Sequence, residues 1–236
     1  MVIKNSKVFN IGALFAVTFM GVLFTIFSPV FEGKNGLEFA DASFNRLAKG
    51  SSYFIPKVSR VVESKVGTSF TANMTLDKAE DAESTAKLFA AAGAKVEQNG
   101  AQLKIAGDLG LVLRSSLKDA DAMYRNDGKS VSERYKIDEK KTLQYWWTAF
   151  SKMEKNMKKE KLLAEAKVIS EVMKKGIEPG YNFYQIDANK VSEHAGMLSG
   201  LLVFYVFYTM WWGYAIFYMF EGFGLTMKKA KVKKEA

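Results

Sequence analysis

Residues 201–223 read LLVFYVFYTMWWGYAIFYMFEGF, and 11 of these 23 side chains are aromatic. The only charged residue in this stretch is Glu221, near its end. Residues 195–220 carry no charged side chain at all. An uncharged run of this length exceeds the roughly 20 apolar residues that a helix needs to cross a hydrocarbon core. We therefore predict a transmembrane helix over residues 195–227.

A second uncharged stretch lies at residues 8–31, VFNIGALFAVTFMGVLFTIFSPVF. A positively charged start followed by apolar residues is also typical of a cleaved signal peptide, but there the apolar part is only about 7–15 residues long. The first site with the small-x-small pattern of cleavage, at residues 40–42, lies far downstream. This pattern favours an uncleaved signal anchor that forms a first transmembrane helix.

The lysines at the outer flanks of the two spans predict their orientation. Lys4 and Lys7 precede the first span, and five lysines follow the second span in residues 228–236. Short flanks rich in lysine stay in the cytoplasm, whereas long loops cross largely regardless of their charge. We expect residues 1–7 and 228–236 to be cytoplasmic and residues 32–194 to form an extracytoplasmic domain at the plasma (inner) membrane.

The overall composition excludes several classes of function. The chain has no cysteine, so disulfides, thiol chemistry and cysteine-ligated zinc are excluded. Its net charge is +9, but the 27 basic and 23 acidic residues of segment 32–194 leave a net charge of only +4 there. The excess of lysine follows from the membrane topology. Nucleic acid is not an expected partner.

Hydrophobic periodicity predicts two helices at the start of the segment between the spans. One covers residues 37–49 and the other begins at Pro56 and is closed by Gly67. The residues expected on their buried faces are Leu37, Ala40, Phe44 and Leu47, then Ile55, Val58, Val61, Val62 and Val66.

A small sheet is predicted next. Apolar and polar residues alternate over residues 69–76, as in a half-buried strand. Asp77 is expected to cap a following helix that Gly93 ends. The pair Asn99-Gly100 lies between two short alternating runs and predicts a hairpin with a type I′ turn, in which both residues have a positive φ.

The remainder of the segment is expected to be helical. We predict a helix from Asp108 to about Arg125, a loop over residues 126–134, and an amphipathic pattern over residues 138–176. This pattern slips across residues 158–161, so it is compatible with one long helix or with two in series, ended by Gly176 and Pro179-Gly180. The predicted fold class is α+β and mainly helical. Two transmembrane helices flank one extracytoplasmic domain that has a small antiparallel sheet and a long amphipathic helix.

No catalytic, cofactor-binding or metal-binding residues are predicted. His194 is the only histidine, which excludes a paired-His haem or a His-His metal site within one chain and leaves only a haem with one His and one Met ligand. Phosphate-binding glycine motifs are absent. We expect His194 and Glu221 to be polar residues at the two membrane interfaces, and we expect neither an enzyme nor a resident cofactor.

The rings of the second span point to a further role for it. Several lie in its middle third, where a tyrosine hydroxyl that faces lipid is unfavourable. A Gly-x-x-x-Gly pattern can let helices approach closely. The residues expected to pack on partner helices are Gly196, Gly200, Tyr205, Tyr208, Trp211, Trp212 and Tyr214.

Two features of the outer segment allow a functional and a structural interpretation. Trp146 and Trp147 are either core residues or a platform on which a ligand stacks. The lysine-rich residues 155–161 are either a solvated helix face or a site for an anionic polymer or headgroup. Core packing and a solvated face are the interpretations that we favour for the two features.

The sequence thus favours a non-catalytic integral membrane subunit or assembly protein. Its expected partners are other membrane subunits, or further copies of itself, and the lipid bilayer. One alternative is an extracytoplasmic ligand-binding or sensing module with a separate output partner. The other is a subunit of a redox complex that contacts quinone or haem.

Overall fold

The computed structural model describes residues 3–225. For Glu193 it describes the backbone but not the side chain. The basic segment 228–236 lies outside the described residues. The chain is a mainly helical α+β protein with one three-stranded antiparallel sheet and two long apolar helices. It divides into two compact units, one formed by residues 45–189 and the other by the described residues on either side of it.

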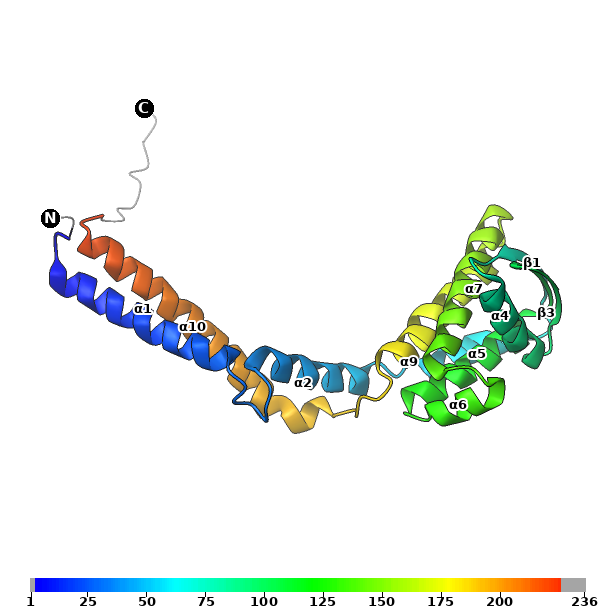
Figure 1. The fold of residues 1–236 in the computed structure, drawn as a ribbon, viewed down its shortest axis with the longest axis horizontal. Coiled ribbons are helices and arrows are strands. Elements are labelled where there is room, and N and C mark those ends of the chain that lie inside the picture. Colours follow the sequence, from blue (N-terminus) through cyan, green and yellow to red (C-terminus); the bar gives the residue numbers. More distant parts are fainter. Residues whose placement is uncertain (1–2, 226–236) are drawn as a thin grey trace, which may run out of the picture. The chain divides into compact units, whose positions relative to one another are not determined.

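The first unit contains the two apolar helices, α1 (Ser6–Phe27) and α10 (Ala195–Gly222), which run side by side in opposite directions (Figure 1). Both are shorter than the predicted spans. Helix α1 ends because Ser28 has the extended backbone that a residue before proline prefers. Beyond α10, Gly224 has a φ of +81°, which a right-handed helix does not allow. A 3₁₀ turn, Val191–His194, precedes α10.

Helix α2 (Gly36–Ser51) confirms the first predicted helix. Asn35 caps it reciprocally: its side chain accepts from the backbone N–H of Glu38 (2.9 Å), whose carboxylate accepts from the N–H of Asn35 (3.1 Å). Of the four residues predicted on its buried face, only Leu47 is buried, and Leu37 is 57% exposed. Only the last turns of α2 belong to the second unit, so only they contribute to its packing.

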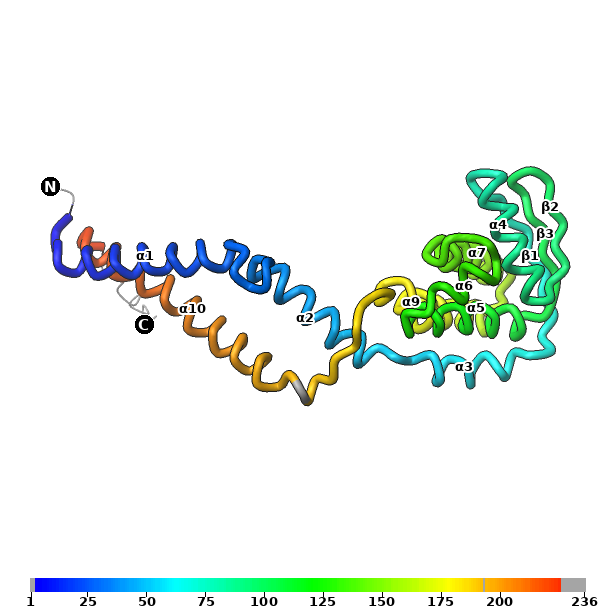
Figure 2. Tube along the Cα trace, turned by 60° about the horizontal axis from the view of Figure 1, so that its bottom comes forward, coloured from blue at the N-terminus to red at the C-terminus, as the bar shows by residue number. Residues whose placement is uncertain are grey.

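The sheet of the second unit has the strand order β1-β3-β2, and both pairs are antiparallel (Figure 2). Strand β1 (Ser69–Thr75) alternates buried and exposed residues as predicted, and β3 (Gln102–Asp108) pairs with it so that Ala72 lies opposite Ile105. Helices α4 (Ala79–Ala91) and α7 (Glu139–Lys159) pack on the buried face. The other face is open to solvent.

The hairpin is confirmed, but its turn differs from the prediction. Strand β2 (Lys95–Asn99) extends to Asn99, which pairs with Gln102. The turn therefore consists of Gly100 and Ala101, and of these only Gly100 has a positive φ, +57°. The type I′ assignment was wrong because Asn99 belongs to the strand ladder.

This turn gives a stability prediction. Gly100→Val places a β-branched side chain at a positive φ, and we expect it to lower the free energy of unfolding by about 1–3 kcal/mol. Ala101→Val is the matched control, because Ala101 has a negative φ in the same turn, and it should cost clearly less. Thermal unfolding of both variants measures the difference. Equal losses would mean that the positive φ of Gly100 is not required.

Two further predicted helices of the second unit are present, although the first ends four residues before the predicted Gly67. Helix α3 (Ile55–Glu63) has a proline in its first turn as expected, although Val66 lies beyond it and is 41% exposed. Helix α5 (Leu109–Tyr124) begins after Asp108, whose side chain accepts from the N–H of Leu111. Asp77, by contrast, does not cap α4. Lys78 occupies the cap position there and makes no capping hydrogen bond with its side chain.

The prediction of a loop over residues 126–134 was wrong, because helix α6 (Gly128–Tyr135) occupies most of this segment. Asp127 caps this helix by accepting from the N–H of Ser130 at 3.3 Å. Val131 and Tyr135 are buried one helical turn apart and hold α6 against the core.

The amphipathic pattern over residues 138–176 forms two helices. After α7 the chain turns at Lys161, whose φ is +63°, and α8 (Leu163–Val172) packs back on α7. Helical structure then continues through a π-helical turn, η1 (Met173–Ile177), into the short α9 (Glu178–Asn182). Gly176 and Pro179 therefore do not end the helical structure as predicted.

A buried carboxylate, Asp119, organises the core between α5, α6 and α7. It accepts from Trp146 Nε1 at 2.9 Å and from the Tyr135 hydroxyl at 2.7 Å, and it forms an ion pair with Arg134. Burial raises the pKa of Asp119, although these donors and the charge of Arg134 oppose the shift. Burial and the nearby Asp119 charge raise the pKa of Tyr135 to about 12.

A buried lysine ties the two ends of the second unit together. Lys49 Nζ donates to the carbonyls of Phe183 (3.0 Å) and Ile186 (2.5 Å) and to Asn126 Oδ1 (3.0 Å). Burial lowers its pKa, and the charge of Asp187 opposes the shift. At the end of the second unit, the backbone N–H of Asn189 donates to the carbonyl of Arg46 at 3.1 Å. The entering and leaving segments are thus fixed to each other.

Candidate functional site

The first candidate site is the surface of the α1–α10 pair. The two helices lie in close contact at two glycines. A Cβ added at Gly12 would lie 2.6 Å from the backbone nitrogen of Met219 and 2.9 Å from the carbonyl of Ala215. A Cβ at Gly222 would lie 2.6 Å from Phe9 Cβ. Small residues on facing helices allow such backbone contact.

Aromatic side chains fill the pair toward the other end of α1. Phe19 stacks on Tyr208, with ring centroids 4.2 Å apart, and its ring lies 4.6 Å from that of Trp212. Trp211 Nε1 donates to the carbonyl of Phe15 at 3.1 Å, across the two helices. An indole N–H inside an apolar pair needs an acceptor, and this carbonyl supplies it. Part of the aromatic content of α10 therefore serves its contact with α1.

The pair is closed at the chain ends by the backbone. The N–H groups of Lys4 and Asn5 both donate to the carbonyl of Gly222, each at 2.9 Å. The rings of Phe9 and Phe223 lie 5.1 Å apart beside this contact. Two independent sets of contacts thus hold the N-terminus of α1 on the C-terminus of α10.

Tyr205 and Tyr214 make no hydrogen bond or ring contact with the described residues of α1. Tyr205 is 64% exposed and Tyr214 49% exposed, and neither hydroxyl makes a hydrogen bond within the described residues. They are nine residues apart, which is about two and a half turns of an α-helix. The two hydroxyls therefore lie on opposite flanks of α10.

The Gly-x-x-x-Gly pattern of α10 is not in contact with α1. A Cβ added at Gly196 or Gly200 would meet nothing within 4 Å. The glycines that do mediate close approach, Gly12 and Gly222, were not predicted. Gly12 is followed by the small residue Ala16 one turn later, but Met219 and Tyr218 stand three and four residues before Gly222, so no small-residue pattern marks Gly222.

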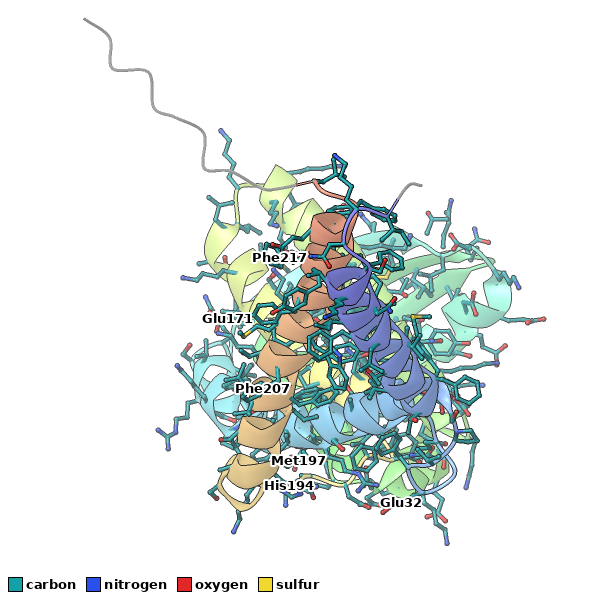
Figure 3. All side chains as sticks on the ribbon, turned by 90° about the vertical axis from the view of Figure 1, so that its left-hand side faces the viewer. Glu32, Glu171, His194, Met197, Phe207 and Phe217 are labelled. Carbon is teal, nitrogen blue, oxygen red and sulfur yellow. The ribbon has the colours of Figure 1, made fainter. Side chains whose placement is uncertain are left out.

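Most of the surface of this pair is apolar. In the most apolar window of each helix only 6% of the residues are buried, and both helices are long and apolar enough to cross a membrane. Figure 3 labels Phe207, which is 67% exposed, and Phe217, which is 40% exposed, along α10. A soluble protein rarely exposes an apolar surface of this extent.

The two predicted interfacial residues lie at the ends of α10. His194 precedes the helix, and its Nδ1 lies 3.3 Å from the carbonyl of Lys190. Glu221 is exposed in the last turn, and its carbonyl accepts from the N–H of Gly224 at 2.8 Å. Among the described residues no three or more His, Asp or Glu side chains are grouped closely enough to hold a metal ion.

The second candidate site is a groove in the second unit, beside Trp147. Trp146 is fully buried and belongs to the core, whereas Trp147 is only half-buried. The groove has a volume of about 440 Å³ and lies between α7 and the η1–α9 segment. Its lining residues are Leu143, Gln144, Trp147, Thr148, Ile177, Glu178, Tyr181 and Asn182. Trp146 is thus a core residue, whereas Trp147 packs against the edge of the core and also lines the groove.

Comparison with known proteins found no relative of this chain. The chain matches no protein-family model, no curated protein and no solved structure with which it was compared. The two sites are therefore interpreted from their own geometry.

Proposed function

We propose that this chain is a non-catalytic integral membrane subunit or assembly protein whose paired spans bind partner helices on two flanks. The observation that carries this proposal is the placement of Tyr205 and Tyr214. Both belong to the apolar helix α10, both hydroxyls lack a hydrogen bond among the described residues, and they lie on opposite flanks.

The depth of these residues supports the proposal. The middle of α10 lies near Tyr208. At about 1.5 Å per residue, Tyr205 and Tyr214 lie within about 10 Å of it. The hydrocarbon core extends about 15 Å on each side of its centre. Both hydroxyls would therefore lie in hydrocarbon, where an unpaired polar group is costly and a helix with an acceptor would satisfy it.

The face of α10 between these flanks has a different chemistry. Val206 is nine residues from Ala215, which is buried against α1, so Val206 points directly away from α1. Met210 and Phe217 share this outward side of the helix and have no hydroxyl or amide group. We assign this face to lipid and the two tyrosine flanks to partner helices.

The same proposal includes the topology. Both termini would be cytoplasmic, and residues 32–194 would form the extracytoplasmic domain at the plasma (inner) membrane. Lys4 and Lys7 at the start of α1 support this orientation through the positive-inside rule. The outer domain would then present its solvent-exposed surface to further partners.

The test removes the hydroxyls and keeps the rings. We expect the double variant Tyr205→Phe/Tyr214→Phe to insert normally but to dissociate more readily from its native complex. Each lost hydrogen bond contributes about 0.6 kcal/mol in a membrane, so the two together weaken association about eightfold. Native electrophoresis of detergent extracts at matched expression measures the complex.

The matched control is Met210→Leu/Phe217→Leu, which changes two exposed side chains on the face of α10 that we assign to lipid and removes no hydroxyl. It should leave the native complex intact. If the tyrosine double variant migrates like wild type, the tyrosines do not bind partner helices. If the control dissociates equally, hydrophobic area rather than hydrogen bonding holds the complex.

A second candidate function, an extracytoplasmic ligand-binding or sensing module, is favoured by the groove at Trp147. Its apolar floor and polar rim are typical of small-molecule sites. The groove lies wholly within the second unit. The two functions are compatible in one chain.

A further inference from the structure

The groove beside Trp147 has an ordered arrangement of surfaces. Leu143 and Ile177 form its floor, with exposed fractions of 0% and 1%. Trp147 and Tyr181 are half-buried and stand on α7 and α9. Polar side chains surround this apolar part. They are Gln144, Thr148, Glu178 and Asn182.

The π-helical turn is a second, independent feature at the same place. In η1 the N–H of Glu178 donates to the carbonyl of Met173, five residues back. Such a turn inserts one extra residue and rotates everything after it relative to a regular helix. It thereby sets the direction of the groove residues on α9. Single π turns inside α-helices occur frequently at functional sites.

Close packing behind the π turn makes the groove wall rigid. A Cβ added at Gly176 would lie 2.5 Å from Leu117 Cδ2, and one added at Gly180 would lie 2.7 Å from the carbonyl of Ala120. Both glycines therefore lie against α5 with no space for a side chain. The wall that carries Tyr181 is preformed, which lowers the cost of ordering it around a ligand.

The charges of the lining restrict the class of ligand. Glu178 is its only charged residue, so nothing in the lining compensates an anionic ligand. The cation Lys140 already lies over the Tyr181 ring, 5.8 Å from its centroid, and 5.9 Å from that of Tyr184. Tyr181 is thus already engaged by one cation. A neutral ligand fits this lining better than an ion of either sign.

Hydrogen-bonding groups are available at the edge of the rings. Gln144 Nε2 donates to the Tyr181 hydroxyl at 2.9 Å. This bond fixes both side chains, and it leaves Gln144 Oε1 as an acceptor and the Tyr181 O–H as a donor. The amide of Asn182 and the hydroxyl of Thr148 add further donors and acceptors.

We propose that this groove binds a neutral saccharide of one or two rings. A pyranose has an apolar face of C–H groups that stacks on an indole, and hydroxyls around its edge that match amide and hydroxyl side chains. Trp147 would supply the stacking surface, and Gln144 and Asn182 would bind the hydroxyls. A volume of about 440 Å³ lies within the range of small-ligand sites. This inference does not depend on the partner-helix proposal.

The test uses the full chain in a detergent without a sugar headgroup. Titration calorimetry and saturation-transfer NMR with N-acetylglucosamine, maltose and lactose should detect at least one ligand with a Kd in the millimolar range or tighter. Trp147→Leu should weaken its binding at least tenfold, and Trp147→Phe should retain most of it, because a ring face remains. Gln144→Leu should also weaken binding, whereas Gln98→Leu, a matched change at the exposed hairpin, should not.

Choline is the probe for the competing class, since an aromatic pair with a carboxylate also suits a quaternary ammonium. Glu178→Gln should not abolish saccharide binding, but it should abolish binding of a cation. Thermal unfolding must show that each variant is folded. The proposal would be overturned if no saccharide binds at concentrations up to about 10 mM. It would also be overturned if Trp147→Leu leaves saccharide binding unchanged, or if choline binds and its binding requires Glu178.

Discussion

Asp119→Ala is expected to lower the free energy of unfolding of the second unit, residues 45–189, by about 3–5 kcal/mol. Asp119 is completely buried, and it accepts from Trp146 and Tyr135 and pairs with Arg134. Its removal leaves a guanidinium without its counter-charge and two buried donors without acceptors. Each buried donor without a partner costs about 1–3 kcal/mol.

The measurement is a denaturant titration of the full chain in detergent, followed by tryptophan fluorescence. Asp119→Asn should lower the free energy of unfolding less than Asp119→Ala does, because its amide oxygen still accepts a hydrogen bond. Asp121→Ala on the same helix is the control. Asp121 is partly exposed, pairs with Arg125 and accepts from the Tyr53 hydroxyl at 2.7 Å, and exposed pairs contribute about 1 kcal/mol or less. If Asp119→Ala and Asp121→Ala lower the free energy of unfolding equally, Asp119 does not organise the core.

Gly12→Leu is expected to separate α1 from α10. Its side chain would collide with the backbone of α10 at Met219 and Ala215, and this backbone cannot yield as a flexible side chain can. Overpacking costs about 1–3 kcal/mol, which corresponds to a loss of pairing of about five- to 160-fold. Insertion should be unaffected, because leucine partitions well into hydrocarbon.

Cross-linking measures this pairing, since the chain has no cysteine of its own. The Phe9→Cys/Phe223→Cys pair replaces two rings that lie 5.1 Å apart. Treatment with a short thiol-reactive cross-linker, followed by proteolysis of the second unit, should leave the two helices covalently linked. Gly12→Leu should reduce this linked product, while Gly21→Leu should not, because a Cβ at Gly21 meets nothing within 4 Å. Equal yields in the two variants would contradict the observed helix pair.

The elements that the sequence predicts best are those with a long, clear period. Strand β1 alternates over its whole length, and α5 has both a capping residue, Asp108, and a continuous buried stripe. Helix α6 was missed because it has only eight residues and its buried contacts are few. Asp127 at its cap was the available signal, but the glycine and serines around it are equally typical of a loop.

Other features depend on contacts between distant segments. Asp119 is buried because its donors come from Arg134, Tyr135 and Trp146 on two later helices, which no local pattern reveals. The π turn carries helical structure past Pro179, although proline cannot donate to the carbonyl four residues back. Gly180 packs against Ala120 beside this turn, and Ala120 also lies far from Gly180 in the sequence.

The contact face of the two apolar helices could not be predicted for a related reason. A helix that is apolar all round has no polar side to mark the opposite, packed side. Only the small residues remain as a guide. Gly12 and Gly222 make the close contacts between α1 and α10, whereas the packing of Gly196 and Gly200 on partner helices stays a prediction. The structure divides the predicted ring residues into Tyr208, Trp211 and Trp212, which contact α1, and two tyrosines that do not.

Site-specific photo-cross-linking in intact cells tests the central claim most directly. A photoreactive phenylalanine derivative is placed singly at Tyr205, Tyr214 or Val206. We predict protein adducts from the first two positions and none from Val206, which faces lipid in our assignment. The size of the adducts distinguishes a second copy of the chain from another subunit. Absence of protein adducts at both tyrosine positions, or equal adducts at all three, would contradict the assignment of the two tyrosine flanks to partner helices.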